Sequence, residues 1–371
     1  MTTRTTFPHL IPPQRPSVEV VRRATPEAVR DKGYSNIPFL KRPPWIWEIA
    51  LYFASEGISA GAHLISTAAE LFGGGRYERL VRASRYLSFI FILPAPPLLI
   101  ADLGRPERFH HMLRVFKPIS PMNVGAWGLT AFSIPVMLMA AQQAEKDGLP
   151  LLSKLPRFLG RVPTKALAIA GLPGAATMVS YPGVLLSMTS NPLWTSSRFV
   201  GALISLSSIS MATAAISLTL SRDDLSVRPL QKLERVATVC EAGALAGYLA
   251  TSRTAARSLI TGRYAKHFWL GAVGCGLLLP ALMHRRQERT REEKKSGRGV
   301  LPALLKLVGG LALKWALVHA GHVSALDPKA NRYVSRPTES SPGWRPSLEH
   351  QAADRTRATA LPTGHQARSF T

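Results

Sequence analysis

The amino-acid sequence predicts an all-α, polytopic membrane protein with about eight transmembrane helices. Apolar runs of about 20 residues, the length that spans a bilayer, recur along the chain. Most lysines and arginines fall between these runs. A soluble domain with so many apolar runs would need a core larger than 371 residues can build. The runs are Trp45–Phe72, Tyr86–Leu103, Met122–Ala144, Ala166–Met188, Trp194–Leu220, the short Val236–Ala250, His267–His284 and Val300–Ala320.

The positive charge of the chain belongs to the loops. A formal net charge of +24 would by itself suggest a nucleic-acid-binding protein. Because the basic residues sit in the gaps between apolar runs, we expect membrane lipid and no nucleic acid as a partner. Loops after the odd-numbered runs carry more lysine and arginine than the others, which favours a cytoplasmic position for them. Both termini would then lie on the outer side of the membrane.

The two ends of the chain differ from its middle. Residues 1–44 form a polar arm with several prolines and without the apolar core of a cleavable signal peptide. The tail, residues 321–371, is rich in Ser, Thr, Pro and Arg, a composition typical of disordered segments. Either end could instead clasp a partner subunit. The membrane domain is expected to occupy residues 45–320.

The first run carries a polar stripe. Its members recur in steps of four and three residues, which places them on one helix face. They are Tyr52, Glu56, Ser59, His63, Ser66 and Glu70. Gly57 and Gly61, four residues apart beside the stripe, favour close helix packing. A stripe with an acid and an imidazole must face protein or water and not lipid. It either packs against polar groups of a neighbouring helix or forms a polar site or proton path.

The second run is broken and ends on an acid. Pro94, Pro96 and Pro97 should unwind the helix locally, because each proline removes a donor and clashes with the preceding turn. Irregular backbone at this depth is tolerated where it lines a cavity or is buried in protein, although a plain kink is an equal reading. Asp102 follows the break, and Arg105 and Arg108 stand just beyond it.

Four further polar residues fall in the later runs. Tyr181, beside Pro182, is either a hydrogen-bond donor or an interfacial aromatic residue. Glu241 lies near the start of the short sixth run, where a solvated helix end explains it as well as a site does. Lys306 can extend its ammonium group to the membrane surface from the end of the last run. Lys314 is nearer the middle of that run, and with Glu241 it marks a possible proton path.

Several kinds of site are not indicated. Cys240 and Cys275 lie inside predicted helices and cannot supply the four ligands of an iron–sulfur cluster. Haem needs two histidines at one depth on facing helices, and apart from His63 the candidates lie at helix ends: His267, His284, His319 and His322. No dinucleotide or Walker phosphate loop is present, and no metal site is expected.

Three motifs resemble the NrfD/PsrC family, the integral membrane subunits of polysulfide, nitrite and related reductase complexes. The most specific motif joins the second and third runs, and the other two support it. They are ADLGRPERF at 101–109 with FKPISPMNVGAW at 116–127, YFASEGISAGA at 52–62, and YPGVLL at 181–186. The resemblance covers about residues 44–320. Lys314, where the family would carry arginine, and Pro182, where threonine is common, depart from the pattern.

The resemblance implies two four-helix bundles that exchange electrons between membrane menaquinone or ubiquinone and an iron–sulfur, ferredoxin-like subunit. It implies no haem or cluster in this chain, and molybdoenzyme or cytochrome subunits in the same complex. It places a quinone pocket among the first four helices of a multi-pass protein of the bacterial inner membrane. Glu56 and His63 would handle protons or bind the quinone carbonyls, and Tyr181 would donate a hydrogen bond. Asp102 and Arg105 would form a charged network beside the pocket.

Two other functions remain open. The protein could instead be a proton-conducting, energy-coupling subunit without a working quinone site, in which Asp102, Glu56 and Lys314 move protons. A secondary transporter, suggested by the broken helix, would be built from inverted repeats. No such repeat is visible in the sequence.

Overall fold

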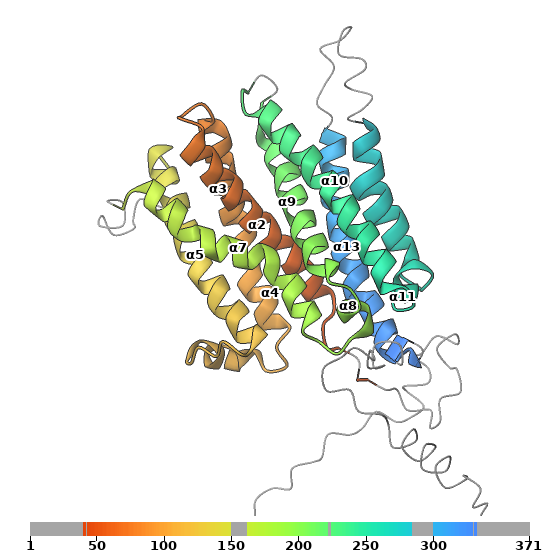
Figure 1. Ribbon diagram of the computed structural model, residues 1–371. Helices are drawn as coiled ribbons and strands as arrows, with labels where there is room; N and C mark the ends of the chain where they lie inside the picture. Colours follow the sequence, from red (N-terminus) through yellow and green to blue (C-terminus); the bar gives the residue numbers. More distant parts are fainter. Residues whose placement is uncertain are drawn as a thin grey trace, which may run out of the picture. The chain divides into compact units, whose positions relative to one another are not determined.

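The computed structural model describes residues 40–41, 43–149, 162–221, 224–283, 300–328 and 330–331. The regular structure of these residues is helical, without strands (Figure 1). Most of the predicted arm and most of the predicted tail lie outside the described residues. The all-α expectation is confirmed for the part of the chain that is described.

The helices follow the predicted apolar runs. The N-terminal helices are α2 (Trp47–Phe72), α3 (Glu78–Ile92), α4 (Ala95–Ala101), the 3₁₀ helix η2 (Pro106–Leu113), α5 (Pro121–Lys146) and α7 (Thr164–Ser187). The C-terminal helices are α8 (Pro192–Thr195), α9 (Phe199–Thr219), α10 (Val227–Ser252), α11 (Arg257–Ile260), the π-helix η3 (His267–Leu278) and α13 (Val300–Leu326). Helix α13 therefore continues beyond the predicted end of its run at Ala320.

Five of the described helices are long and apolar enough to cross a membrane. They cover Glu78–Ala101, Pro121–Lys146, Thr164–Ser187, Phe199–Thr219 and Val300–Leu326, and a shorter apolar helix covers His267–Met283. Helices α2 and α10 fall outside this set. Each contains several ionisable residues, which lower its mean hydropathy. The expected number of eight spans therefore stays a prediction.

Helix α2 lies among other helices, which explains how it tolerates its polar stripe. It packs against α3, α7, α9 and α13. Tyr52, Glu56, Ser59, His63 and Ser66 are all buried, as the stripe predicts. A side chain at Gly57 would collide with Ser208 of α9, so this glycine permits the close approach expected from its spacing.

The proline cluster breaks the second run where the sequence predicts. Helix α3 ends at Ile92, and α4 begins at Ala95 after a turn. Helix α4 ends at Ala101, and Asp102 caps its C-terminus. The chain then leaves the bundle into η2, none of whose residues is buried. The C-terminal end of α4, which Asp102 caps, thus lies at the end of the helices opposite the turn between α2 and α3 (Figure 1).

Candidate functional site

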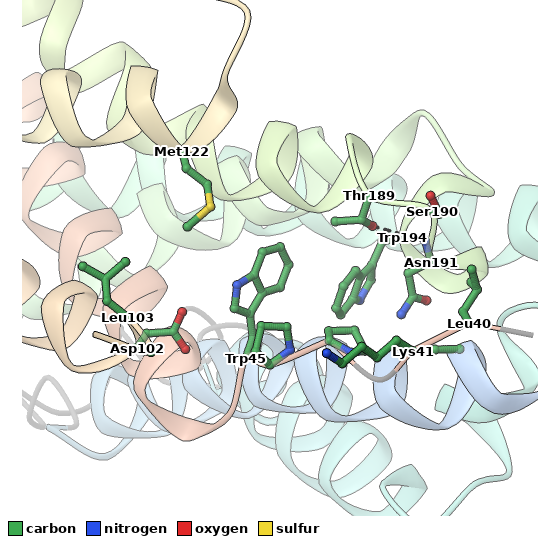
Figure 2. A pocket seen from close by; sticks show the side chains of 14 residues that line it. Leu40, Lys41, Trp45, Asp102, Leu103, Met122, Thr189, Ser190, Asn191 and Trp194 are labelled. Atoms are coloured by element: carbon green, nitrogen blue, oxygen red, sulfur yellow. Dashed lines mark hydrogen bonds between the residues drawn. The ribbon is translucent and has the colours of Figure 1, made fainter. Parts of the chain in front are cut away.

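A cavity of about 440 Å³ lies at the end of the helices marked by Asp102 (Figure 2). Its walls come from the segment before α2, the end of α4, the start of α5, the α7–α8 loop, α8 and the end of α13. The lining residues are Leu40, Lys41, Pro43, Pro44, Trp45, Asp102, Leu103, Gly104, Met122, Thr189, Ser190, Asn191, Trp194 and Ala325. The volume is within the range of about 300–1,000 Å³ that small-molecule sites occupy.

Two tryptophans form an aromatic wall of the cavity. The rings of Trp45 and Trp194 stack with centroids 5.4 Å apart and an interplanar angle of 27°. Trp194 donates its indole N–H to the Leu317 carbonyl at 2.9 Å, and Asn191 donates to the Gly321 carbonyl at 2.8 Å. Helix α13 therefore holds the α7–α8 loop and α8 in place. A flat wall of this kind suits a planar aromatic or quinonoid ring.

Asp102 supplies an ionisable group to the cavity. Figure 2 shows its carboxylate beside Trp45 and Leu103. Burial, and then the negative charge of Glu48, raises the pKa of Asp102 to about 6. A carboxyl group with this pKa changes protonation state near neutral pH, as a proton acceptor must.

The structure shows no direct ion pair between Asp102 and Arg105, which the resemblance placed in one charged network. Among the described residues, Glu48 is the charged group that acts on Asp102. Helix α4 ends before Asp102, so Arg105 is not one turn further along the same helix. It stands before η2 as an exposed residue and does not line the cavity.

A second group of polar residues is buried deeper in the protein. Glu56 is fully buried, and neither of its carboxylate oxygens has a hydrogen-bond partner among the described residues. Tyr52, one turn earlier on α2, lies close to Glu56 but outside hydrogen-bond geometry. Tyr181 of α7 interacts electrostatically with both, and it packs against Gly125 of α5. The structure thus brings Glu56 and Tyr181 together but places neither in the cavity wall.

His63 belongs to a different part of the interior. Its Nε2 lies 3.1 Å from the Ala168 carbonyl of α7, and its ring makes an edge contact with Phe132 at 5.5 Å. It lies seven residues beyond Glu56, which is about 10 Å along a helix. His63 therefore does not line the cavity, and its contacts are those of a residue packed between α2, α5 and α7.

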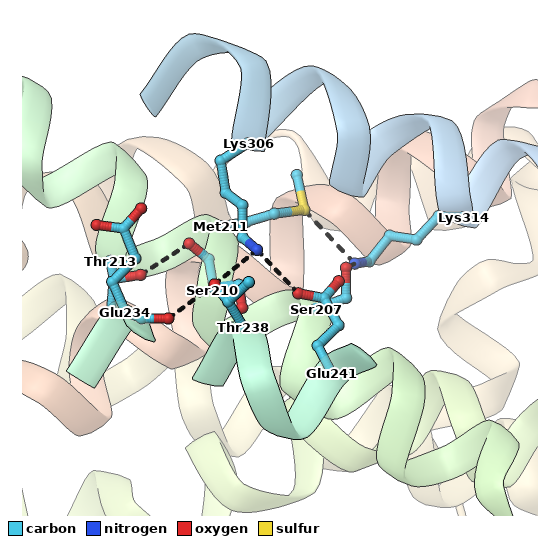
Figure 3. Close-up of polar contacts among 9 residues, drawn as sticks. All are labelled: Ser207, Ser210, Met211, Thr213, Glu234, Thr238, Glu241, Lys306 and Lys314. Atoms are coloured by element: carbon cyan, nitrogen blue, oxygen red, sulfur yellow. Dashed lines mark hydrogen bonds and ion pairs between the residues drawn. The ribbon is translucent and has the colours of Figure 1, made fainter. Parts of the chain in front are cut away.

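A buried ionic cluster occupies the C-terminal helices (Figure 3). Lys306 of α13 lies 3.2 Å from the Glu241 carboxylate of α10 and donates to the Thr238 hydroxyl at 2.9 Å. Lys314 is 1% exposed and interacts electrostatically with Glu241 and, on α2, with Glu56. Glu241 is 4% exposed and Lys306 2% exposed, so the alternative in which each is solvated at a helix end does not hold. Ionisable groups of both halves of the chain are thereby linked.

Sequence reasoning missed the burial of Lys306 and the cavity's aromatic wall. The polar residues Glu234, Thr238 and Glu241 follow the same steps of four and three that revealed the stripe on α2, and all three belong to α10. That signal would have predicted the buried face of α10. Trp45 and Trp194 carry no comparable signal, because tryptophan at the end of an apolar run is typical of a membrane interface.

Two known proteins are similar to the chain over about three quarters of its length, and a third is similar over about a quarter. The family model described as Polysulphide reductase, NrfD matches residues 37–325. The polysulfide reductase C chain of Wolinella succinogenes is 28% identical over 302 residues, which are 75% of this chain and 94% of that protein. Protein NrfD of Escherichia coli (strain K12) is 24% identical over 311 residues, which are 76% and 95% of the two proteins. The selenate reductase C subunit of Mesobacillus selenatarsenatis is 30% identical over 98 residues, which are 26% and 22%.

Proposed function

The chain belongs to the NrfD (polysulphide reductase) family, and we propose that it is the quinone-reactive membrane subunit of a respiratory oxidoreductase complex. Family membership and the five apolar helices make it a multi-pass membrane protein. Relatives named as parts of a polysulfide reductase and a selenate reductase support a place in a reductase complex. The proposal includes eight spans in two four-helix bundles, in the bacterial inner membrane.

The cavity is the single observation that carries this proposal. It combines a stacked tryptophan pair, the apolar side chains of Leu40, Leu103 and Met122, and one carboxyl group. These residues fit a quinone head group, which needs a flat apolar surface and a few polar partners for its oxygens. Asn191 and Thr189 line the same cavity and supply such polar groups.

Oxidation of a quinol to a quinone releases two electrons and two protons. We propose that Asp102 accepts a proton at the cavity and that Glu56, with Tyr52 and Tyr181, handles protons deeper in the protein. The electrons would pass to an iron–sulfur, ferredoxin-like subunit, and from there to molybdoenzyme or cytochrome subunits. The bound substrate would be menaquinone or ubiquinone, and this chain needs its partners for turnover.

Asp102→Asn is expected to remove the pH dependence of quinol oxidation between pH 5 and 7. With a pKa of about 6, the carboxylate fraction rises from about a tenth at pH 5 to about nine tenths at pH 7. A proton acceptor works only when deprotonated, so the wild-type rate should rise about tenfold across this range. The measurement is the pH–rate profile of the complex purified with its native partners.

The matched control is Glu107→Gln, which removes an exposed acid from the neighbouring η2. It should keep the wild-type profile. If Asp102→Asn shows the same rise with pH as wild type, Asp102 is not the acceptor and the proposed chemistry at the cavity fails.

A proton-conducting, energy-coupling subunit is the second candidate function. The observation that favours it is the buried cluster of Lys306, Lys314 and Glu241, which lies apart from the cavity and interacts with Glu56. Buried ionisable groups within membrane helices are costly and commonly mark proton or ion pathways. Such a subunit would translocate protons whether or not the cavity binds quinone.

Glu241→Gln distinguishes the two candidates. Glutamine keeps the shape of the side chain but cannot exchange a proton. If the cluster conducts protons, proteoliposomes containing the complex should lose most of their proton translocation per electron while quinol oxidation continues. A fall of both rates in the same proportion would count against a separate proton path.

A further inference from the structure

Lys314 is a buried cation that forms no close ion pair with a described residue. No carboxylate lies within 4 Å of its ammonium group among the described residues. Its hydrogen-bond contacts are both long, at 3.5 Å to the Ser207 hydroxyl and 3.5 Å to the Met211 sulfur (Figure 3). A buried ammonium is strongly destabilising unless it is paired, so its charge must be balanced by groups slightly further away.

Two carboxylates on different helices balance that charge. Lys314 interacts electrostatically with Glu241 of α10 and with Glu56 of α2. The packing places Glu56 in this layer, because Gly57 presses against Ser208 and the preceding Ser207 contacts Lys314. Helices α2, α9 and α13 thus meet at the level of the ammonium group.

The two carboxylates differ in what else holds them. Glu241 lies 3.2 Å from a second lysine, Lys306, which Thr238 also fixes. Neither oxygen of Glu56 has a hydrogen bond of good geometry in the part of the chain that the structure describes, although the Tyr52 hydroxyl lies close by. Lys314 is the one cation that acts on the Glu56 carboxylate among the described residues, whereas Glu241 also has Lys306.

From this arrangement we propose that Lys314 is a switching cation. Its ammonium group lies closer to Glu56 when that carboxylate is ionised, and it moves toward Glu241 when Glu56 is protonated. The lysine side chain has a flexible four-carbon stem, which suits such a movement. The weak contacts to Ser207 and Met211 do not hold the ammonium in either position. Lys314 is thereby a positioning residue that couples the protonation of Glu56 to the Glu241–Lys306 pair.

The switch deepens the proposed function and rests on it for its biological role. When a proton from the quinone site reaches Glu56, the ammonium group of Lys314 would be free to approach Glu241. Its positive charge would then weaken the ion pair between Lys306 and Glu241. The titratable groups facing Glu56 are Tyr52, Tyr181 and Lys314, and those facing Lys314 are Glu56 and Glu241. Proton transfer in the N-terminal helices would then change the charge distribution around Glu241 in the C-terminal helices.

Infrared titration of the full chain in lipid nanodiscs tests the switch without quinone or partner subunits. The carboxyl bands of Glu56 and Glu241 are assigned by their loss in Glu56→Gln and Glu241→Gln. Lys314→Met should raise the midpoint pH of the Glu56 band by about one unit, a tenfold change in proton affinity, because the nearby cation is gone. Lys306→Met, which removes the other lysine, should leave the Glu56 band in place.

A cation that moves has a second signature. Glu56→Gln should lower the midpoint pH of the Glu241 band relative to wild type, because the ammonium group of Lys314 then moves toward Glu241. Between Lys314→Met and Glu56→Gln/Lys314→Met, the midpoint of the Glu241 band should not change in this way. This double variant also removes one charge of each sign, so it is expected to fold if the single Lys314→Met variant does not.

Two results would overturn the proposal. One is an equal shift of the Glu241 band by Glu56→Gln with and without Lys314, which would indicate a fixed charge. The other is a shift of the Glu56 band by Lys306→Met as large as that caused by Lys314→Met. Because neither measurement involves quinone, failure of the switch is distinguishable from failure of the proposed function.

Discussion

Quinone binding should be almost eliminated when Gly104 is replaced by tryptophan. Gly104 lines the cavity, and no atom lies within 4 Å of the position that a Cβ would take. An indole at this site can therefore be built without a backbone clash and would fill much of the 440 Å³. We expect binding about 100-fold weaker, which corresponds to about 3 kcal/mol of lost contact free energy.

The measurement is a titration of the purified chain with a short-chain naphthoquinone. Binding is followed by quenching of tryptophan fluorescence, since Trp45 and Trp194 line the cavity. The control is Gly243→Trp on α10, a glycine with equally open surroundings that does not line the cavity. It adds the same indole and should bind the quinone like wild type. Wild-type affinity in Gly104→Trp would mean that the quinone binds elsewhere.

Glu56→Gln should reduce quinone-linked electron transfer by roughly 100-fold or more, the lower range for loss of a positioned proton carrier. Glutamine keeps the volume of the side chain at this fully buried position but cannot ionise. Tyr181→Phe removes the neighbouring phenol hydroxyl and should slow the same reaction. The measurement is the rate of the complex purified with its native partners, with the amounts of all subunits checked by gel.

A substitution of the same kind at an exposed site controls for general effects. Glu78→Gln, at the start of α3, changes an acid on the surface and should leave the rate unchanged. If both Glu56→Gln and Tyr181→Phe oxidise quinol at the wild-type rate, the assignment of these residues to proton handling is wrong.

The buried face of α2 could be predicted because spacing alone defines it. Tyr52, Glu56 and His63 repeat in steps of four and three, and an acid on a membrane helix must face protein. The break before Asp102 was predictable for a similarly local reason, since three prolines cannot continue a helix. Both predictions depend on neighbours in sequence, and the structure agrees with them.

The cavity and the ionic cluster depend on tertiary packing. Trp45 and Trp194 come from segments far apart in the chain, and their stacking follows from how α13 holds α8. Glu241 seemed to lie near a helix end because the apolar run begins at Val236. Helix α10 begins at Val227, so this residue is in its middle. Arg105 lies beyond the end of α4 and does not line the cavity, which its closeness to Asp102 in the sequence does not reveal.

Photoaffinity labelling with an azido-quinone tests the central claim most directly. The purified chain is illuminated with the probe, and the labelled peptides are identified by mass spectrometry. We predict label on the cavity segments at 40–45, 102–104 and 189–194, competed by unlabelled quinone and lost in Gly104→Trp. Label confined to other helices, or undiminished in Gly104→Trp, would contradict a quinone site at this cavity.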